Sequence, residues 1–149
     1  MQDNDFRRVE AWLYSIPRIE IALDSLKLDL ELLDTKIASP PRWASNPHGA
    51  PVTGGDLDSR LDKWGEFIDE YPVRRQETLE RIQEKEQQLA CYEKVMDLLR
   101  AENSQLVQLV RKKYYEKIKP DQVIWEKHLI ISERSYYRMR RYIVQTFFE

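Results

Sequence analysis

The chain has few of the residues on which small catalytic and metal-binding sites depend. Its 149 residues include one cysteine, two histidines and four glycines. The lone cysteine excludes an intrachain disulfide and fits a reducing compartment, and no His/Cys spacing matches a zinc site. The glycines occur outside any strand–turn–helix pattern that would bind phosphate. We therefore expect no catalytic residues, no metal ligands and no cofactor.

Long apolar runs are missing as well. No stretch approaches the roughly 18 apolar residues that a membrane-spanning helix needs, and the first residues lack the apolar core of a signal peptide. We expect a cytoplasmic protein without a membrane partner. What the chain does have is charge, since Asp, Glu, Lys and Arg make up 34% of it. Such a composition is typical of helical proteins.

Apolar residues in the first 100 positions follow the a/d spacing of a coiled coil. The first series is Val9, Trp12, Ile16, Ile19, Leu23, Leu26, Leu30, Leu33 and Ile37. The second is Leu61, Trp64, Ile68, Tyr71, Ile82, Leu89, Tyr92, Met96 and Leu99, with the polar residues Arg75, Thr78 and Lys85 at three of its a/d positions. We predict a long, coiled-coil-like helical hairpin over residues 1–100. A break or kink near Ile16 is expected because of Pro17, and the second helix should continue, kinked, across Pro72.

The segment between the two series, residues 38–56, contains four of the seven prolines and three of the four glycines. Its composition excludes a helix, and it is long for a connection between packed helices. Trp43 and His48 provide side chains that suit docking on the hairpin or on another protein. Two interpretations stay open here, a cap or mobile loop on the one hand and a partner-binding loop on the other.

The two apolar series hold more surface than a two-helix hairpin buries by itself. Further contacts, with the C-terminal region or with a second chain, are expected for Leu28, Leu32, Leu89, Tyr92 and Met96. Because twofold pairing is the commonest closed symmetry, we expect a homodimer.

The last third of the chain predicts three short helices separated by turn signals. An apolar helix is expected over residues 105–117, and Pro120 interrupts it before a short helix over residues 122–129. After a tight turn, Ser132 is a good N-cap for a third helix that ends near Phe147. The third helix carries four arginines within two turns, namely Arg134, Arg138, Arg140 and Arg141. We expect residues 101–149 to form a helix-turn-helix domain, which makes the fold all-α.

The charge is divided unevenly along the chain. Residues 1–98 contain 13 basic and 20 acidic residues, whereas residues 99–149 contain 11 basic and 6 acidic residues. A formal net charge of -2 therefore hides an acidic part and a basic part. Basic residues gathered on one helix favour a module that binds nucleic acid.

The C-terminal pattern also resembles a known family. It consists of an apolar helix with Tyr114, a short helix ending at Leu129, and then Ile131-Ser132-x-x-Ser135-Tyr136-Tyr137-Arg138-x-Arg140-Arg141. This pattern is similar to the region-4-like helix-turn-helix of bacterial sigma factors. It resembles more closely the small late-gene transcription activators of phages, of the RinA and ArpU type. The resemblance implies a phage regulator in a bacterial host cell that binds double-stranded DNA at promoters, with host RNA polymerase as a further candidate partner.

The resemblance assigns faces to the third helix, and the helical spacing agrees with it. The inward set is Tyr136, Met139, Ile143 and Phe147. The candidates for DNA base contact are Glu133, Arg134, Ser135, Tyr137 and Arg138, because Arg pairs with guanine and Glu accepts from cytosine. The candidates for phosphate contact are Lys112, Lys113, Lys127, Arg140 and Arg141.

Two other functions fit the same elements. The first is a phage DNA-packaging subunit, similar to a small terminase, in which the helices assemble the protein into a ring. The second is a helical adaptor that uses its C-terminal module for protein contact. A monomer or dimer in light scattering favours the regulator, whereas an eight- to ten-fold ring favours the packaging subunit.

Overall fold

The computed structural model describes residues 1–39 and 54–149, and within these ranges it contains helices and turns but no β-strand. The all-helical class predicted from the sequence is confirmed. Trp43 and His48 lie outside the described residues, as does most of the predicted loop. None of the described helices is both long enough and apolar enough to cross a membrane.

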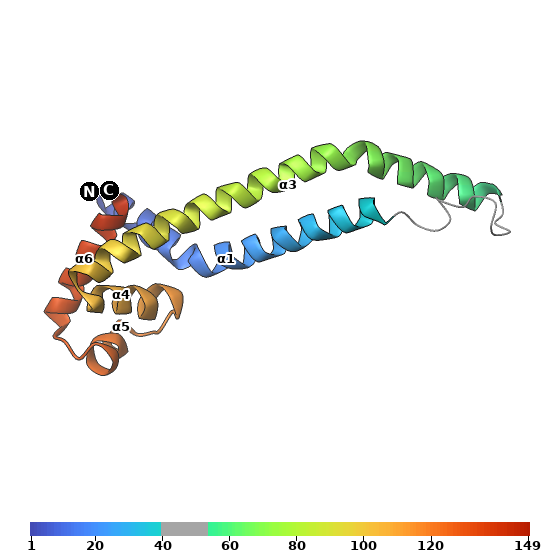
Figure 1. The fold of residues 1–149 in the computed structure, drawn as a ribbon. Helices are drawn as coiled ribbons and strands as arrows, with labels where there is room; N and C mark the ends of the chain where they lie inside the picture. The colour runs from blue at the N-terminus through green and yellow to red at the C-terminus, as the bar shows by residue number, and fades with distance from the viewer. Residues whose placement is uncertain (40–53) are drawn as a thin grey trace. The chain divides into compact units, whose positions relative to one another are not determined.

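Two long helices account for most of the first hundred residues (Figure 1). Helix α1 spans Asp3–Ala38 and contains Pro17. The helix continues through the proline, so the predicted break near Ile16 is wrong, whereas the kink given as the alternative is compatible with a continuous helix. One backbone N–H is lost at Pro17, while the Ser15 hydroxyl donates to the Trp12 carbonyl at 2.5 Å and supplies a donor in the same turn.

Helix α3 spans Gly54–Glu102 and contains Pro72. The prediction of one continuous helix across this proline is confirmed. The apolar register before the proline is not the predicted one, since Phe67 is buried whereas Ile68 is 44% exposed. A strict heptad repeat assumes 3.5 residues per turn, whereas a straight α-helix has about 3.6, so the buried position drifts along a helix of 49 residues.

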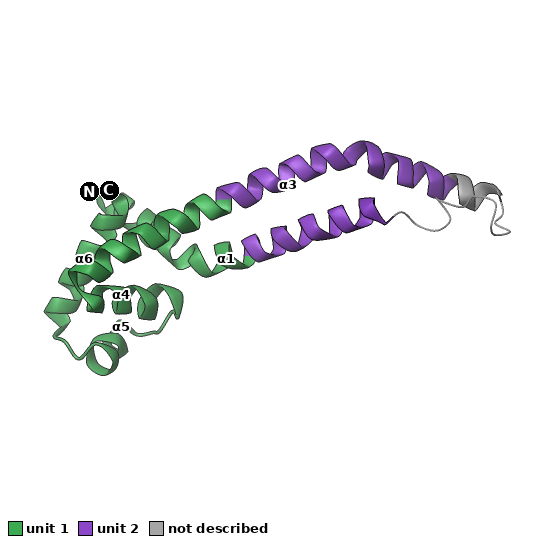
Figure 2. Cartoon of the chain, viewed as in Figure 1, with its two compact units in different colours: residues 1–21, 85–149 green, residues 22–84 purple. Residues whose placement is uncertain are grey.

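The described chain divides into two compact units (Figure 2). Unit 1 contains residues 1–21 and 85–149, and unit 2 contains residues 22–84. The sequence placed a domain boundary at residue 100, which lies inside unit 1. The reason is that the first turns of α1 and the last turns of α3 share one core with the C-terminal helices.

The core of unit 1 combines residues from all of these segments. Its most buried members are Leu13 and Ile16 from α1, Leu99 from α3, and Leu109, Val110, Tyr114, Ile124, Tyr136, Ile143 and Val144 from the C-terminal region. Tyr92 and Met96 are buried in the same core, and Leu89 packs against it. These three residues are therefore covered by the chain itself, and they give no reason to invoke a second copy.

In unit 2 the two long helices lie beside each other (Figure 2). Leu23, Phe67 and Ile82 are buried there. At the other end of α1, Asp34 accepts hydrogen bonds from the Tyr71 hydroxyl at 2.5 Å and from Arg75 at 3.1 Å. Leu28 and Leu32 remain 55% and 59% exposed.

Five short elements complete unit 1: α4 (Ser104–Val110), the π-helical turn η1 (Arg111–Tyr115), α5 (Asp121–Val123), the π-helical turn η2 (Ile124–His128) and α6 (Glu133–Phe148). Asn103 caps α4, since its side chain accepts the N–H of Gln105 at 3.0 Å. The order of three short helical segments agrees with the sequence prediction.

The turns after η1 and η2 share one backbone design. Each contains a non-glycine residue with positive φ, Lys117 at 57° and Ile130 at 53°. The next residue donates its N–H six positions back, from Ile118 to Lys112 at 3.0 Å and from Ile131 to Trp125 at 2.9 Å. Each left-handed residue ends its helix sharply, and the bond six positions back, one residue longer than that of a Schellman motif, satisfies one of the last carbonyls. The second of these turns places α6 directly after η2.

Candidate nucleic-acid interface

Helix α6 begins where the sequence predicted. The Ser132 hydroxyl accepts the backbone N–H of Ser135 at 3.1 Å, as an N-cap should. It also donates to the Ser135 hydroxyl at 2.9 Å. The cap fixes the first turn of α6, which leaves the side chains of Glu133 and Arg134 in solvent.

The buried face of α6 is the predicted one. Tyr136 and Ile143 are fully buried, and Met139 and Phe147 pack against the core of unit 1. Val144 is fully buried as well, although the sequence analysis did not include it. Its position eight residues after Tyr136 places it on the same helical face, so the spacing contained the signal.

The opposite face of α6 is rich in arginine. All five candidates for base contact are exposed, and Arg141 is exposed with them. A surface depression runs along this face, lined by Arg134, Tyr137, Arg138, Arg141, Tyr142 and Gln145. Arg134, Arg138 and Arg141 form no hydrogen bond or ion pair with any described residue. Three positive charges on one helical face thus remain unneutralised. We call this surface the arginine face (Arg134, Arg138, Arg141).

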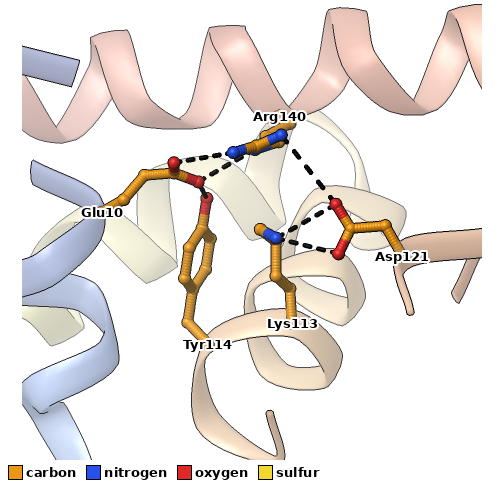
Figure 3. Close-up of polar contacts among 5 residues, drawn as sticks. All are labelled: Glu10, Lys113, Tyr114, Asp121 and Arg140. Carbon is orange, nitrogen blue, oxygen red and sulfur yellow. Dashed lines mark hydrogen bonds and ion pairs between the residues drawn. The ribbon is translucent and has the colours of Figure 1, made fainter. Parts of the chain in front are cut away.

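Arg140 lies on the other side of the helix and belongs to a buried polar cluster (Figure 3). Its Nε and Nη2 atoms donate to the two carboxylate oxygens of Glu10, at 2.9 and 2.7 Å. The Tyr114 hydroxyl donates to the same carboxylate at 2.5 Å. Arg140 was predicted to contact phosphate, and the structure assigns it instead to an internal ion pair with α1.

Lys113 makes the second ion pair of this cluster. Its Nζ donates to both carboxylate oxygens of Asp121, at 2.9 and 3.1 Å. Only 6% of Lys113 is exposed. Asp121 also lies 3.9 Å from Arg140 Nη1, so that Glu10, Arg140, Asp121 and Lys113 alternate in charge. The prediction that Lys113 contacts phosphate is therefore wrong, because the side chain is inside the protein.

The cluster alters the acid–base properties of its members. Bidentate hydrogen bonds to the Glu10 carboxylate raise the pKa of Arg140 above its ordinary value. Burial raises the pKa of Tyr114, and its hydrogen bond to Glu10 adds to this effect. Burial also raises the pKa of Tyr136, with a further contribution from the negative charge of Asp121. All of these groups hold one protonation state at neutral pH, which suits a structural cluster rather than a proton-transfer site.

The remaining candidates for phosphate contact lie nearer the surface. Lys127 is exposed, and Lys112 is partly exposed in an ion pair with Glu116 at 3.0 Å. Arg111, Lys117 and Lys119 are exposed too, although the sequence analysis did not select them. The feature of the sequence that could have indicated them is the cluster of basic residues between the first two short helices. Among the described residues, no group of three or more His, Cys, Asp or Glu side chains is placed to hold a metal ion.

These observations define an all-helical protein whose last helix presents an arginine face on one side and joins a buried charge cluster on the other. Comparisons of the chain with protein-family models, curated proteins and solved structures find no match. The function must therefore be argued from the residues of this chain.

Proposed function

We propose that the protein binds double-stranded DNA in a sequence-specific manner and regulates transcription. The observation that carries this proposal is the arginine face of α6, three exposed guanidinium groups without a described acidic partner. Such a surface fits a polyanion, since each phosphate neutralised by Arg or Lys releases condensed counterions and favours binding.

The arrangement of the C-terminal helices supports a helix-turn-helix. In such motifs a sharp turn precedes the recognition helix, and the N-terminal residues of that helix reach the base edges in the major groove. Here the turn at Ile130 and the Ser132 cap start α6 abruptly, and α6 packs on α4. Its first turns are exposed on one side and anchored by Tyr136 on the other.

Two roles can be assigned to the exposed side chains. Arg134 and Arg138 are one helical turn apart and are suited to bidentate contact with guanine, while Glu133 is suited to accept from cytosine. Ser135 and Tyr137 are exposed as well, on the two flanks of the row formed by Arg134 and Arg138. Arg141, Lys127 and Lys112 remain as candidates for phosphate contact, now without Lys113 and Arg140.

The resemblance to small phage late-gene activators gives this proposal its biological setting. It favours a regulator that acts at promoters inside a bacterial host cell, with host RNA polymerase as a candidate partner. A homodimer would suit a site with twofold symmetry, since dimers of such motifs bind two half-sites about one helical turn apart.

Selection of bound duplexes from a random pool, followed by binding measurements at several salt concentrations, tests the proposal. We expect an enriched sequence and an affinity that falls roughly 10³-fold or more between 50 and 200 mM salt. The Arg134→Ala/Arg138→Ala variant should lose most of the discrimination. Arg74→Ala/Arg81→Ala, which removes the same charge from exposed positions of α3, is the matched control and should bind normally.

Three results would contradict the proposal. They are failure to bind any duplex at low salt, binding that does not respond to salt, and equal loss of binding in the control variant. An eight- to ten-fold ring in light scattering would favour a packaging subunit over a regulator.

A further inference from the structure

A second surface of unit 1 is formed by the start of α1 and the end of α6 and is mainly apolar. Val9, Trp12, Phe147 and Phe148 line a hollow between the start of α1 and the end of α6. Its aromatic wall is well packed, since the Phe147 ring lies 6.0 Å from Trp12 and 5.9 Å from Tyr92. We call this surface the Phe148 hollow.

One of the side chains that line the Phe148 hollow is half exposed. Phe148 is 50% exposed, whereas its neighbour Phe147 packs against the core. A hollow and a half-exposed aromatic side chain at its edge therefore occur on the same patch. A self-complementary patch of this kind is what a twofold interface requires, because the same surface must serve both copies.

Charged residues at the rim of the Phe148 hollow include one of each sign, so the rim of one copy can pair with the rim of another. Arg8 and Asp5 both line the hollow, one turn apart on α1. Arg8 is exposed and has no ion-pair partner among the described residues. The Asp5 carboxylate accepts a long hydrogen bond, 3.4 Å, from the backbone N–H of Gln2. A twofold axis near Phe148 would bring Arg8 of one copy toward Asp5 of the other.

We propose that the Phe148 hollow is the self-association surface of this protein, and that Phe148 of each copy fills the hollow of the other. This surface differs from the face of α1 that the sequence suggested, where Leu28 and Leu32 are exposed. The inference concerns the protein alone and stands apart from DNA binding.

Sedimentation of the full chain at several concentrations tests this surface. The wild type should form a species of twice the 17.9 kDa chain mass, and Phe148→Asp should sediment as a single chain. Because Phe148 is half exposed, the substitution leaves the core filled, and an unchanged circular dichroism spectrum would verify the fold. Leu32→Asp, an equally exposed position on α1, is the matched control and should remain a dimer.

Cys91 gives an independent measurement at the same place. It is the single cysteine of the chain, it is exposed, and it lines the Phe148 hollow. Its rate of reaction with a thiol reagent should fall as the wild-type concentration rises, and should stay constant in Phe148→Asp.

Several outcomes would overturn the inference. These are a wild type that stays a single chain at all concentrations, a dimer dissociated by Leu32→Asp but not by Phe148→Asp, and a Cys91 reactivity independent of concentration. DNA binding by a single-chain Phe148→Asp variant would leave the proposed function intact, so the two proposals fail separately.

Discussion

The carboxylate of Glu10 accepts two hydrogen bonds, at 2.7 and 2.9 Å, from the guanidinium of Arg140, a residue 130 positions later in the chain. This ion pair joins the start of α1 to the middle of α6. It adds a polar contact to the apolar core that the first 21 residues share with the rest of unit 1. The proposed DNA-binding module therefore includes part of the long helices, and α6 is held in place by a residue of α1.

Removal of Glu10 should strongly destabilise unit 1. In Glu10→Ala the guanidinium of Arg140 and the Tyr114 hydroxyl lose their acceptor while both remain largely buried. Breaking a buried pair by removing one partner costs roughly 3–5 kcal/mol. Urea denaturation measures the free energy of unfolding.

The control for this experiment is Asp34→Ala, which breaks a similar pair with Arg75 at the surface of unit 2. Its side chains are 39% and 41% exposed, so water replaces the lost contact and the midpoint should move little. Equal effects of the two substitutions would show that the Glu10 cluster gives no special stability.

Ile130→Gly should stabilise the protein. Ile130 has φ of 53° and is 81% exposed, so its β-branched side chain strains the backbone and contributes little packing. Glycine relieves this strain, and we expect a gain of up to about 1 kcal/mol after its entropic cost. The melting temperature should rise by roughly 2–4 °C. Ile130→Ala retains a Cβ and should gain less. A lower melting temperature for Ile130→Gly would mean that the exposed Ile130 side chain makes a contact that stabilises the folded protein by more than the backbone strain costs.

The sequence predicted the local features of α6 well. The N-cap at Ser132 and the inward position of Tyr136 follow from residue type and helical spacing, and both are confirmed. Spacing could not show that Arg140 and Lys113 are internal. The partner of Arg140 comes from the other end of the chain. A charged residue beside the core is predicted to be exposed when the acidic residue that pairs with it is not known. The register around Phe67 failed for another reason, since a strict heptad count does not follow the drift of the buried face along a long helix.

Two tyrosine hydroxyls in the core of unit 1, those of Tyr114 and Tyr136, differ in their hydrogen bonding. The Tyr136 hydroxyl is buried and makes no hydrogen bond to a described residue, whereas the Tyr114 hydroxyl donates to Glu10. Tyr136→Phe should therefore leave the free energy of unfolding unchanged or slightly higher. Tyr114→Phe should lose about 1.5–3 kcal/mol, because it removes a hydrogen bond to a charged group.

Tyr136→Ala provides the comparison for these two variants. It removes a fully buried ring and should cost about 3–5 kcal/mol. If Tyr136→Phe were as harmful as Tyr114→Phe, its hydroxyl would have to have a partner in solution. If Tyr137→Ala unfolded the protein while Tyr136→Ala did not, the faces of α6 would be assigned one residue out of step.

Alkaline pH should destabilise unit 1 through its buried tyrosines. Burial raises the pKa of Tyr92 from 10.0 to about 12. Since the unfolded state loses this proton first, the stabilisation is complete below pH 10 and is lost as pH rises toward 12. One such group contributes a slope of about 1.4 kcal/mol per pH unit in that range. Denaturant titrations at several pH values measure the slope, and Tyr92→Phe should reduce it. An unchanged slope in Tyr92→Phe would contradict the assignment.

Substitutions of different basic residues should affect the sequence specificity and the overall affinity of DNA binding differently. Arg134→Ala and Arg138→Ala should each lose about 1–3 kcal/mol on the selected duplex and relax discrimination at one or two base pairs. Lys127→Ala should weaken binding equally on all duplexes and lower the salt slope by about one unit, as expected for a phosphate contact. Lys113→Met, at a buried position, should change neither property in molecules that remain folded. Competition binding with the selected and scrambled duplexes distinguishes these effects. If Arg134→Ala weakened both duplexes equally, Arg134 would contact phosphate, and base reading would have to come from elsewhere on the exposed side of α6.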